Sequence, residues 1–416
     1  MKRRVVITGT GALTPIGNTA EETCRNAESG VCGIGEITSY DTVEMKVKVA
    51  GELKGFRSED YMDRMKARRV ARFTQIALVA SREAFRQSGL DMTKEDRWRS
   101  GICISSGIGG LDIIEREHSR GLKHGFDRVS PLFVPMTICN MAAGMVAIEL
   151  GFQGSCISTV TACASSANSV GEAFRQIRDG YMDVMAAGGS ESCITPLGIG
   201  GFTSMKALSE TKDPLRASIP FDKERNGFVM GEGAGILILE EYWHAKKRGA
   251  EILGEITGYG TSCDAHHMTS PPEDGYGAAH CIKNALSDAG ITPQDVGYIN
   301  AHGTSTEMND RCETRAVKDV FGNHAYRLVM SSTKSMTGHM LGATGAVEAI
   351  LTMNALQKQV APPTIGYQIP DPDCDLDVAA NEKKPLDTNW AISNSFGFGG
   401  HNATIVFKRW YNENEY

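Results

Sequence analysis

The chain has 416 residues, of which 41% are hydrophobic and 22% charged, a composition typical of a globular protein with a large core. Its formal net charge of −7 argues against a nucleic-acid binder, and it contains no apolar run long enough to indicate a membrane span. The 11 cysteines include no Cys-x-x-Cys pair, which argues against a disulfide framework or a zinc site and favours a reduced, cytoplasmic setting.

Strand-like and helix-like patterns alternate along the first half of the chain. Residues 1–9 have a basic head but few apolar residues, which indicates a first strand rather than a secretory signal. Short apolar runs indicate strands, and apolar residues at a helical period indicate helices. The expected strands are Val5–Ile7, Ile102–Ile104, Val184–Gly188 and Gly235–Leu239, and the expected helices are Thr19–Glu28, Lys66–Gln87, Thr137–Leu150, Ala164–Asp179 and Tyr242–Arg248.

The same alternation continues after Gly249-Ala250, the favoured boundary between two units, residues 1–249 and 250–416. Direct self-similarity between the two halves is too weak to establish a repeat. Alternating strands and helices predict an α/β fold. The later strands are expected at Ile252–Gly258, Val296–Ile299, Leu328–Met330, Trp390–Ile392 and Ala403–Phe407, and the helices at Gly277–Ala289, Asp310–Phe321 and Gly345–Gln357.

Cys163 is the most informative single residue. The run Ser158–Thr161 precedes it and the small residues Ala164–Ala167 follow, which indicates a buried strand running into a helix with the thiol at the turn. A helix N-terminus stabilises a thiolate and lowers its pKa, so this cysteine is expected to be a nucleophile. The alternative is a small buried hydrophobic residue, and the local run alone does not separate the two.

Two histidines follow predicted strands in matching, turn-rich contexts. His302 lies within Asn300–Thr306, and His339 ends the run Ser331–His339. Each therefore falls just beyond the carboxyl end of a strand, where open α/β sheets bind ligands. A fourth run, Asn394–Asn402, lies between two strands and is rich in glycine, which lets backbone N–H groups approach an oxyanion.

Together these four runs resemble the β-ketoacyl-acyl-carrier-protein synthases, the condensing enzymes of fatty acid synthesis, and above all the elongating type II enzymes of dissociated bacterial systems. The resemblance covers nearly the whole chain. It implies the thiolase fold, in which two similar α/β halves form five layers, α-β-α-β-α, with the site between them, and it implies a homodimer. The motifs that carry it are Thr161-Ala-Cys163-Ala-Ser, Asn300-Ala-His302-Gly-Thr-Ser-Thr306, Ser332-Thr-Lys334-Ser-Met-Thr-Gly-His339 and Asn394-Ser-Phe-Gly-Phe398-Gly-Gly400.

The resemblance implies a decarboxylative Claisen condensation of an acyl thioester with a malonyl thioester, both on acyl carrier protein, to give a 3-oxoacyl product in fatty acid elongation. Cys163 would hold the acyl group. The imidazole N–H groups of His302 and His339 would stabilise the enolate left by loss of carbon dioxide, each ring held in one tautomer by a partner of its other nitrogen. Backbone N–H groups of Cys163 and Phe398 would form the oxyanion hole. No cofactor is required, because phosphopantetheine arrives on the carrier protein.

Further residues receive roles from the same resemblance. Lys334 is expected to be buried and paired with Glu348, a carboxylate that would be costly to bury alone, although a solvated lysine is the alternative. The expected substrate-binding residues are Ile108, Phe228, Thr304, Thr306, Phe398 and Gly399, with turn capping or plain core packing as the alternative for the threonines and for Ile108.

The resemblance also implies a cation site and a basic surface for the carrier protein. A monovalent cation is matched by Asn300, Ala301, Glu348, Ser393 and Asn394. A basic entrance for an acidic carrier protein is matched by Lys66, Arg68, Arg69, Arg128 and Lys206, each of which could equally be an ordinary solvated charge. The resemblance implies that Phe398 is the aromatic gate of the acyl pocket. One departure from the family pattern is Gly400-His401-Asn402, where relatives read Gly-Thr-Asn, so the effect of His401 on this gate stays open.

Other classes of protein share part of this pattern. A polyketide-type ketosynthase shares the Cys-His-His set and stays open, as does the preferred acyl chain. A thiolase would need a second late catalytic cysteine, and the last one, Cys374, lies in an acidic, proline-rich loop. An initiating synthase would have asparagine at His339, and a non-catalytic partner subunit typically lacks Cys163. A redox sensor would need a resolving cysteine nearby, and Cys156 is the nearest. The run Gly9–Thr14 lacks the third glycine of a dinucleotide site, and the pair His266-His267 lacks metal-ligand spacing on a helix.

Overall fold

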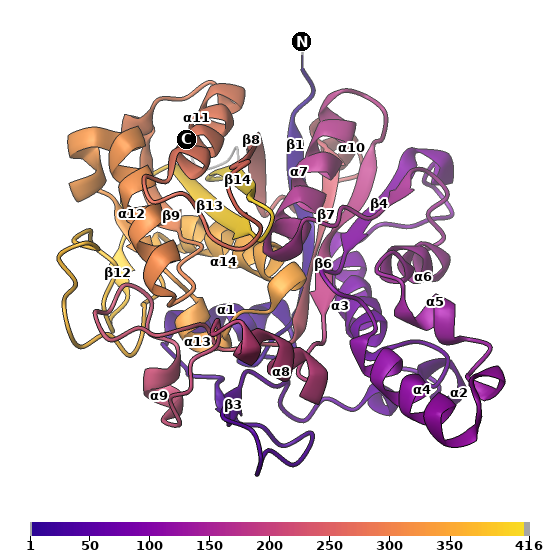
Figure 1. Cartoon of the computed structure of the whole chain (residues 1–416). Coiled ribbons are helices and arrows are strands. Elements are labelled where there is room, and N and C mark those ends of the chain that lie inside the picture. The colour runs from indigo at the N-terminus through magenta and orange to yellow at the C-terminus, as the bar shows by residue number, and fades with distance from the viewer. Residues whose placement is uncertain (1, 412–416) are drawn as a thin grey trace.

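The computed structural model describes residues 2–411, and its largest feature is a 10-stranded mixed sheet with the order β10-β9-β13-β14-β8-β1-β7-β6-β4-β5 (Figure 1). Five of these strands come from each half of the chain. The first five are β1 (Val5–Leu13), β4 (Ser100–Ser105), β5 (Cys156–Ile157), β6 (Val184–Glu191) and β7 (Gly233–Glu241). The others are β8 (Gly254–Cys263), β9 (Val296–Asn300), β10 (Val329–Ser331), β13 (Trp390–Gly397) and β14 (His401–Lys408).

The two halves of the sheet repeat one topology. In the first half β1 is antiparallel to β7, β7 is antiparallel to β6, and β4 lies parallel between β6 and β5. In the second half β8, β14, β13, β9 and β10 follow the same order with the same directions. The halves join only where Val5–Ile7 pairs with Gly254–Ile256. The structure therefore contains the repeat that sequence self-similarity left open.

Helices complete five layers around the two half-sheets. The inner layer is α7 (Ser165–Arg178) and α14 (Thr344–Lys358), which pack against each other and against strands of both halves (Figure 1). On the outer faces, α3 (Arg72–Ser88) covers β1 and β7, while α11 (Tyr276–Ala289) covers β8 and β14. This is the predicted α-β-α-β-α thiolase arrangement.

The remaining elements surround these layers. The longer helices among them are α1 (Ala20–Glu28), α4 (Leu111–His124), α6 (Met141–Leu150), α8 (Pro196–Ser204) and α12 (Glu307–Phe321). The short helices are α2 (Arg64–Ala67), α5 (Phe133–Thr137), α9 (Pro214–Ala217), α10 (Tyr242–Lys247) and α13 (Lys334–Thr337). Two minor sheets pair β2 (Gly35–Glu36) with β3 (Val49–Ala50) and β11 (Val360–Ala361) with β12 (Lys384–Pro385).

Glycines in the sheet let the outer helices approach closely. A Cβ at Gly9 of β1 would lie 2.1 Å from the carbonyl oxygen of Ala84, and one at Gly11 would lie 2.0 Å from that of Ala80. The corresponding strand β8 repeats this device, because a Cβ at Gly260 would lie 2.2 Å from the carbonyl oxygen of Cys281. The glycines of β1 and β8 thus allow the backbones of α3 and α11 to pack directly against these strands.

Two of the expected helices have other bounds in the structure. The helix expected over Lys66–Gln87 breaks into α2 and α3, and the side chain of Gln75 donates to the carbonyls of Ala67 and Val70 at the break. The helix expected over Thr137–Leu150 begins only at Met141, because Ile138 is extended and ends α5.

The strand expected before Cys163 is also wrong. The strand β5 ends at Ile157, at the edge of the sheet, and both of its residues are exposed. The remaining expected strands and helices lie within a few residues of their bounds, except that three strands run further. β1 continues to Leu13, β8 continues to Cys263, and β13 continues to Gly397, into the glycine-rich run. Within residues 2–411 no helix is long and apolar enough to cross a membrane.

The expected boundary at Gly249-Ala250 falls between α10 and β8. Strands of both halves share one sheet, and the inner helices contact both half-sheets, so the division into two domains stays a prediction.

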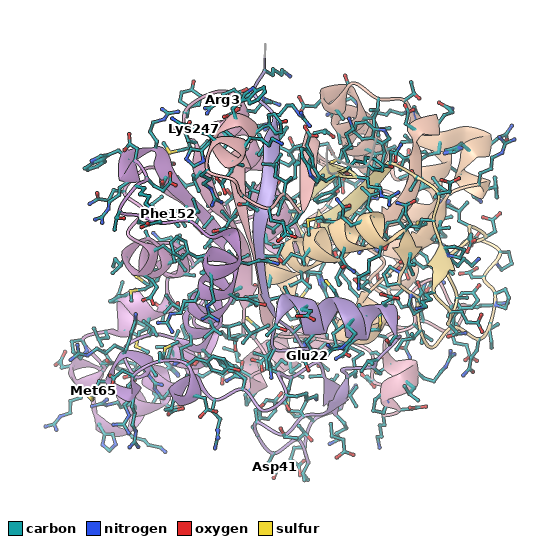
Figure 2. The ribbon with its side chains drawn as sticks, turned by 180° about the vertical axis from the view of Figure 1, so that it is seen from behind. Arg3, Glu22, Asp41, Met65, Phe152 and Lys247 are labelled. Carbon is teal, nitrogen blue, oxygen red and sulfur yellow. The ribbon has the colours of Figure 1, made fainter. Side chains whose placement is uncertain are left out.

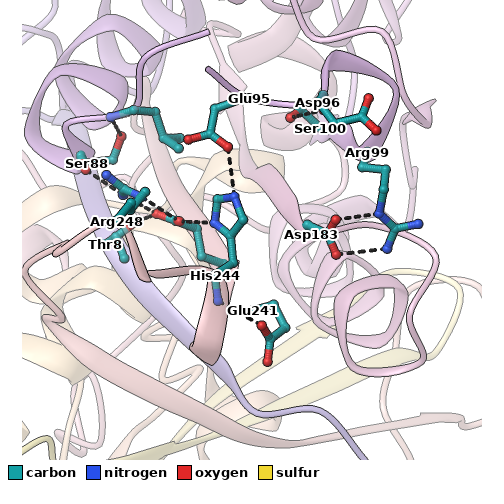
Figure 3. Close-up of polar contacts among 12 residues, drawn as sticks. Thr8, Ser88, Glu95, Asp96, Arg99, Ser100, Asp183, Glu241, His244 and Arg248 are labelled. Atoms are coloured by element: carbon teal, nitrogen blue, oxygen red, sulfur yellow. Dashed lines mark hydrogen bonds and ion pairs between the residues drawn. The ribbon is translucent and has the colours of Figure 1, made fainter. Parts of the chain in front are cut away.

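A polar cluster joins α10 to the first half-sheet (Figure 3). The buried carboxylate of Glu240 in β7 contacts Nδ1 of His244 at 2.8 Å and Nε of Arg248 at 2.9 Å, and it also accepts from Thr8. The other ring nitrogen of His244 lies 2.8 Å from Glu95. Two carboxylates on one imidazole favour its protonated form, and the hydrogen bond to Glu240 raises the pKa of His244.

Replacing His244 with glutamine is expected to lower the thermal midpoint by about 2 °C at pH 6 and by less at pH 9. The folded-state pKa of His244 is raised, so its stabilising effect is complete below the unfolded pKa and is lost as the pH rises through the folded value. Calorimetry of both proteins across this range measures the difference. A gap that does not change with pH would contradict the assignment of a charged His244.

Candidate active site

One cavity of about 500 Å³ brings together the three candidate catalytic side chains. It is lined by Cys163 from the first half of the chain and by His302 and His339 from the second. The other predicted residues that line it are Phe228, Thr304, Thr306, Phe398 and Lys206. Residues distant in sequence therefore meet where the repeated halves face each other.

The nucleophile candidate sits on a strained turn. Cys163 lies in a 3-10 turn, Ala162–Ala164, directly before α7, and Ala162 has φ +50°. Non-glycine residues with positive φ are uncommon and cost energy, and they cluster at functional sites. Ser305, between the two threonines, has φ +69°, and Leu341, two residues after His339, has φ +43°. Strain is therefore present in all three loops of the site.

The predicted low pKa of Cys163 is wrong for this state of the protein. The helix N-terminus is present, but burial raises the pKa of the thiol to about 12, against the opposing effects of Lys334 and of the backbone N–H groups of Phe398 and Cys163. Desolvation of a thiolate outweighs these partial charges. The resting sulfur is therefore a thiol, and it lies beside the two N–H groups expected to form the oxyanion hole.

The two imidazoles are buried and neutral. Their ring centroids lie 5.4 Å apart at an interplanar angle of 84°. Burial and the charge of Lys334 hold the pKa of both His302 and His339 well below the usual value of 6.5. Nδ1 of His339 lies 3.0 Å from the hydroxyl of Thr344, which fixes a tautomer with hydrogen on Nε2 when that hydroxyl donates. Nδ1 of His302 finds no hydrogen-bond partner among residues 2–411, so the expected ring partner is present for one histidine only.

A buried carboxylate that sequence reasoning missed fixes the His302 loop. Glu313 of α12 accepts the N–H of His302 at 2.9 Å, the N–H of Gly303 at 2.8 Å and the side-chain amide of Asn394 at 3.2 Å. Burial raises the pKa of Glu313 to about 7. The available signal was the spacing of Asp310 and Glu313, which places two acids on one face of a helix that begins just after His302.

Lys334 and Glu348 form a buried ion pair. Nζ of Lys334 lies 2.6 Å from Oε1 of Glu348, and both side chains are almost completely inaccessible. The second oxygen of Glu348 finds no partner within residues 2–411, and neither do the side-chain amide of Asn300 or the hydroxyl of Ser393. These orphaned oxygens suit a hard monovalent cation, which prefers oxygen ligands.

Aromatic side chains line the apolar part of the cavity. Phe202, which sequence reasoning missed, lies between Phe228 and Phe398, with ring centroids at 5.4 and 6.2 Å. Ile108 packs in the apolar cluster that contains Cys163 and Phe228 but does not line the cavity itself.

The two threonines lie on the cavity wall, whereas Gly399 and His401 lie outside the cavity lining. The hydroxyls of Thr304 and Thr306 lie 2.9 Å apart on the cavity wall. Gly399 is exposed, and its N–H donates to the carbonyl of Met268 at 2.8 Å. His401 begins β14 and packs against Gly399, outside the cavity lining.

The basic candidates lie in three places. Lys206 lines the cavity. Arg68 and Arg69 are exposed after α2, at the outer edge of the molecule where Met65 projects (Figure 2), and Lys66 pairs with Glu149. Arg128 is exposed in a separate turn after α4. Within one chain the structure therefore does not gather these cations at the cavity mouth.

The fold and the Cys-His-His cavity define a condensing or acyl-transfer class of thiolase-fold proteins. Family models match the chain at residues 2–245, as "Beta-ketoacyl synthase, N-terminal domain", and at residues 253–368, as "Beta-ketoacyl synthase, C-terminal domain". The chain belongs to the β-ketoacyl synthase family.

Its relatives cover nearly its whole length. It is 49% identical over 410 residues to 3-oxoacyl-[acyl-carrier-protein] synthase 2 of Synechocystis sp., spanning 98% of this chain and 99% of the relative. It is 51% identical over 407 residues to the protein of the same name from Staphylococcus aureus (strain COL), spanning 98% of both chains. Among solved structures, a ketosynthase in complex with its type II PKS acyl-carrier protein matches with a TM-score of 0.92 and 37% identity, over 99% of this chain and 100% of that chain.

Proposed function

We propose that this protein condenses acyl and malonyl groups carried on acyl carrier protein into 3-oxoacyl-acyl carrier protein, as an acyltransferase of fatty acid elongation. The observation that carries the proposal is the meeting of Cys163, His302 and His339 in one cavity. The names of its relatives at about half identity support the same reaction.

The first half-reaction loads Cys163. Its sulfur attacks the carbonyl of the incoming acyl thioester, and the resulting oxyanion is held by the N–H groups of Cys163 and Phe398. Collapse forms the acyl-cysteine and releases the carrier's pantetheine thiol, which takes the proton that the cysteine gives up. Thr304 and Thr306 hold the amide of the pantetheine arm.

The second half-reaction makes the carbon–carbon bond. The malonyl thioester loses carbon dioxide, and the electron pair of that bond forms an enolate whose oxygen accepts hydrogen bonds from His302 and His339. Neutral imidazoles suit this role because they donate without transferring a proton to the enolate. The enolate carbon then attacks the carbonyl of the acyl-cysteine, the carbon–sulfur bond breaks, and the expelled sulfur takes up a proton from solvent.

Asn300, Glu348 and Ser393, together with Ala301 and Asn394, would hold a monovalent cation that screens the buried charge of Glu348 and steadies the His302 loop. The unpartnered side-chain oxygens of Asn300, Glu348 and Ser393 support this assignment. No step depends on the ion in this scheme. Replacing potassium and sodium by tetramethylammonium should lower thermal stability if the ion is bound, and an unchanged midpoint would contradict it.

The protein is proposed to act in the cytoplasm as a homodimer. The 11 cysteines, all within the described part of the chain, are unpaired, which suits a reducing compartment. Apolar side chains are exposed on β5, the last strand of the sheet, and on α6, which packs against it, namely Ile157 at 40% and Ile148 at 75%. Val134, on the neighbouring helix α5, is 60% exposed. Light scattering coupled to size exclusion measures the oligomeric state, and a monomer at micromolar concentration would contradict the dimer.

Carrier protein is proposed to dock through Arg68, Arg69, Lys66, Arg128 and Lys206. Changing Arg68 and Arg69 together to glutamate is expected to weaken carrier binding by about tenfold at low salt and by less at high salt, because the attraction is screened. Calorimetric titration with acyl carrier protein measures this. The double substitution Lys246→Glu, Lys247→Glu on α10 is a matched control, and equal losses from both variants would contradict a specific docking surface.

The test of the function is an extension assay with carrier-bound acyl donors of graded length and malonyl-acyl carrier protein. Formation of 3-oxoacyl products one two-carbon unit longer supports it. A polyketide-type ketosynthase is the second candidate, favoured by the similarity to the ketosynthase complex at 37% identity. It predicts repeated extension of unreduced products, whereas an elongating synthase stops after one round.

A further inference from the structure

A buried carboxylate that none of these steps uses lies at the end of β6. Glu191 is fully buried, and its oxygens accept hydrogen bonds from two separate loops. One oxygen accepts from the hydroxyl of Ser106 at 2.7 Å and from the N–H of Ile108 at 3.2 Å. The other accepts from the N–H groups of Gly107 at 2.8 Å and of Gly342 at 3.0 Å.

The surroundings of Glu191 fit an ionised carboxylate. Its remaining contact is the thiol of Cys193 at 3.4 Å, so every polar neighbour recorded for it within residues 2–411 is a donor. Burial raises the pKa of Glu191, and the hydrogen bonds from Ser106, Gly107, Gly342 and Ile108 oppose that rise. No lysine or arginine within residues 2–411 forms an ion pair with it, so these donors alone offset the cost of burying the charge.

The two loops held by Glu191 touch each other through their backbones. A Cβ at Gly342 would lie 2.3 Å from the backbone nitrogen of Gly107 and 2.8 Å from the carboxylate of Glu191. The first loop carries Ile108, and the second follows His339 and carries Leu341. Both of these apolar side chains pack in the cluster that contains Cys163. The carboxylate thus joins the apolar packing behind the sulfur to the loop after His339.

We propose that Glu191 is a positioning residue that determines which acyl chains can be loaded on Cys163, an inference that rests on the condensing function proposed above. Its carboxylate clamps the Ile108 loop against the Leu341 loop and so fixes the apolar packing that closes off the cavity behind the sulfur. Loosening the clamp lets the Ile108 loop retreat, which admits longer acyl chains. The charge of Glu191 also opposes a resting thiolate at Cys163, because it raises the pKa of that thiol.

The test is E191Q, with acylation of Cys163 followed by intact-protein mass spectrometry using carrier-bound donors of short and long chains. The amide keeps the shape of the carboxylate, but its NH₂ group would face the N–H of Ile108 in one orientation and the N–H groups of Gly107 and Gly342 in the other, so the clamp loosens in either case. The ratio of long-chain to short-chain acylation rates is expected to rise by about tenfold, the effect of losing one charge-assisted hydrogen bond. S106A, which removes a single donor, should shift the ratio in the same direction by less.

The matched control is E83Q. Glu83 also joins two segments by accepting backbone N–H groups, those of Ala12 and Ala20, and neither segment belongs to the apolar cluster that contains Cys163. E83Q should leave the ratio unchanged. Two results would exclude a positioning role for Glu191 without affecting the proposed condensing function. One is an acylation rate in E191Q that falls equally for every chain length, and the other is an unchanged ratio in both E191Q and S106A. Failure of the unaltered protein to be acylated by any donor would overturn the condensing function and this inference with it.

Discussion

Replacing Cys163 with alanine is expected to abolish extension of acyl chains, by on the order of a thousandfold or more, while decarboxylation of malonyl-acyl carrier protein continues. The two outcomes separate because only the first half-reaction forms a bond to sulfur. The imidazoles of His302 and His339 also line the cavity, and the contacts that hold them come from Thr344 and Glu313 rather than from the thiol. Release of carbon dioxide and formation of 3-oxoacyl product are measured in the same reaction mixture.

The matched control is Cys281→Ala, which removes another fully buried thiol, on α11 and outside the cavity lining. That variant should retain extension. If Cys163→Ala still extends acyl chains, the nucleophile has been assigned to the wrong residue. If it also loses decarboxylation while remaining folded, the division of roles between sulfur and imidazoles is wrong.

Replacing His302 or His339 with alanine is expected to slow malonyl decarboxylation by about a hundredfold each, with less than a further hundredfold loss in the double variant. Both rings donate to one enolate oxygen, so their effects are not additive. Because both pKa values are held well below 6.5, the rate in the unaltered protein should stay level from about pH 6 to pH 8 and fall only in more acidic solution, where protonation begins.

His324→Ala is the control for these variants, since His324 donates to the carbonyl of Val296 away from the cavity. Decarboxylation that survives in both His302→Ala and His339→Ala would exclude the proposed enolate site. Retained loading of Cys163 from acyl-acyl carrier protein in the same variants would show that the loss lies in the second half-reaction.

The proposed catalytic set could be found in the sequence because each member lies in a turn rich in small residues and carries its own chemical signature. Cys163, His302 and His339 were each found at a junction rich in small residues, and the cavity holds all three. The burial that raises the pKa of Cys163 could not be predicted, because it depends on Phe228, Leu341 and other residues that pack against the sulfur from distant segments.

The supporting residues were harder to recognise for the same reason. Glu313 and Glu191 accept backbone N–H groups of other loops, and apart from the spacing of Asp310 and Glu313 no local pattern marks these contacts. Phe202 lies on a helix of small residues, where nothing in its own segment marks it as a cavity wall. The helix break after Ala67 depends on a side chain, Gln75, that bonds back to the preceding turn. Local periodicity predicted the repeated elements but not their tertiary contacts.

The pairing of β1 has a consequence for how this protein is made. Val5 pairs with Glu241 on one side and with Ile256 on the other, so the first strand to leave the ribosome has neither sheet neighbour until more than half of the chain has been synthesised. Such non-local pairing slows folding and leaves a bare apolar strand exposed to aggregation in the meantime. Nascent chains that stop before β7 should therefore require a chaperone, whereas chains that extend past β8 should not.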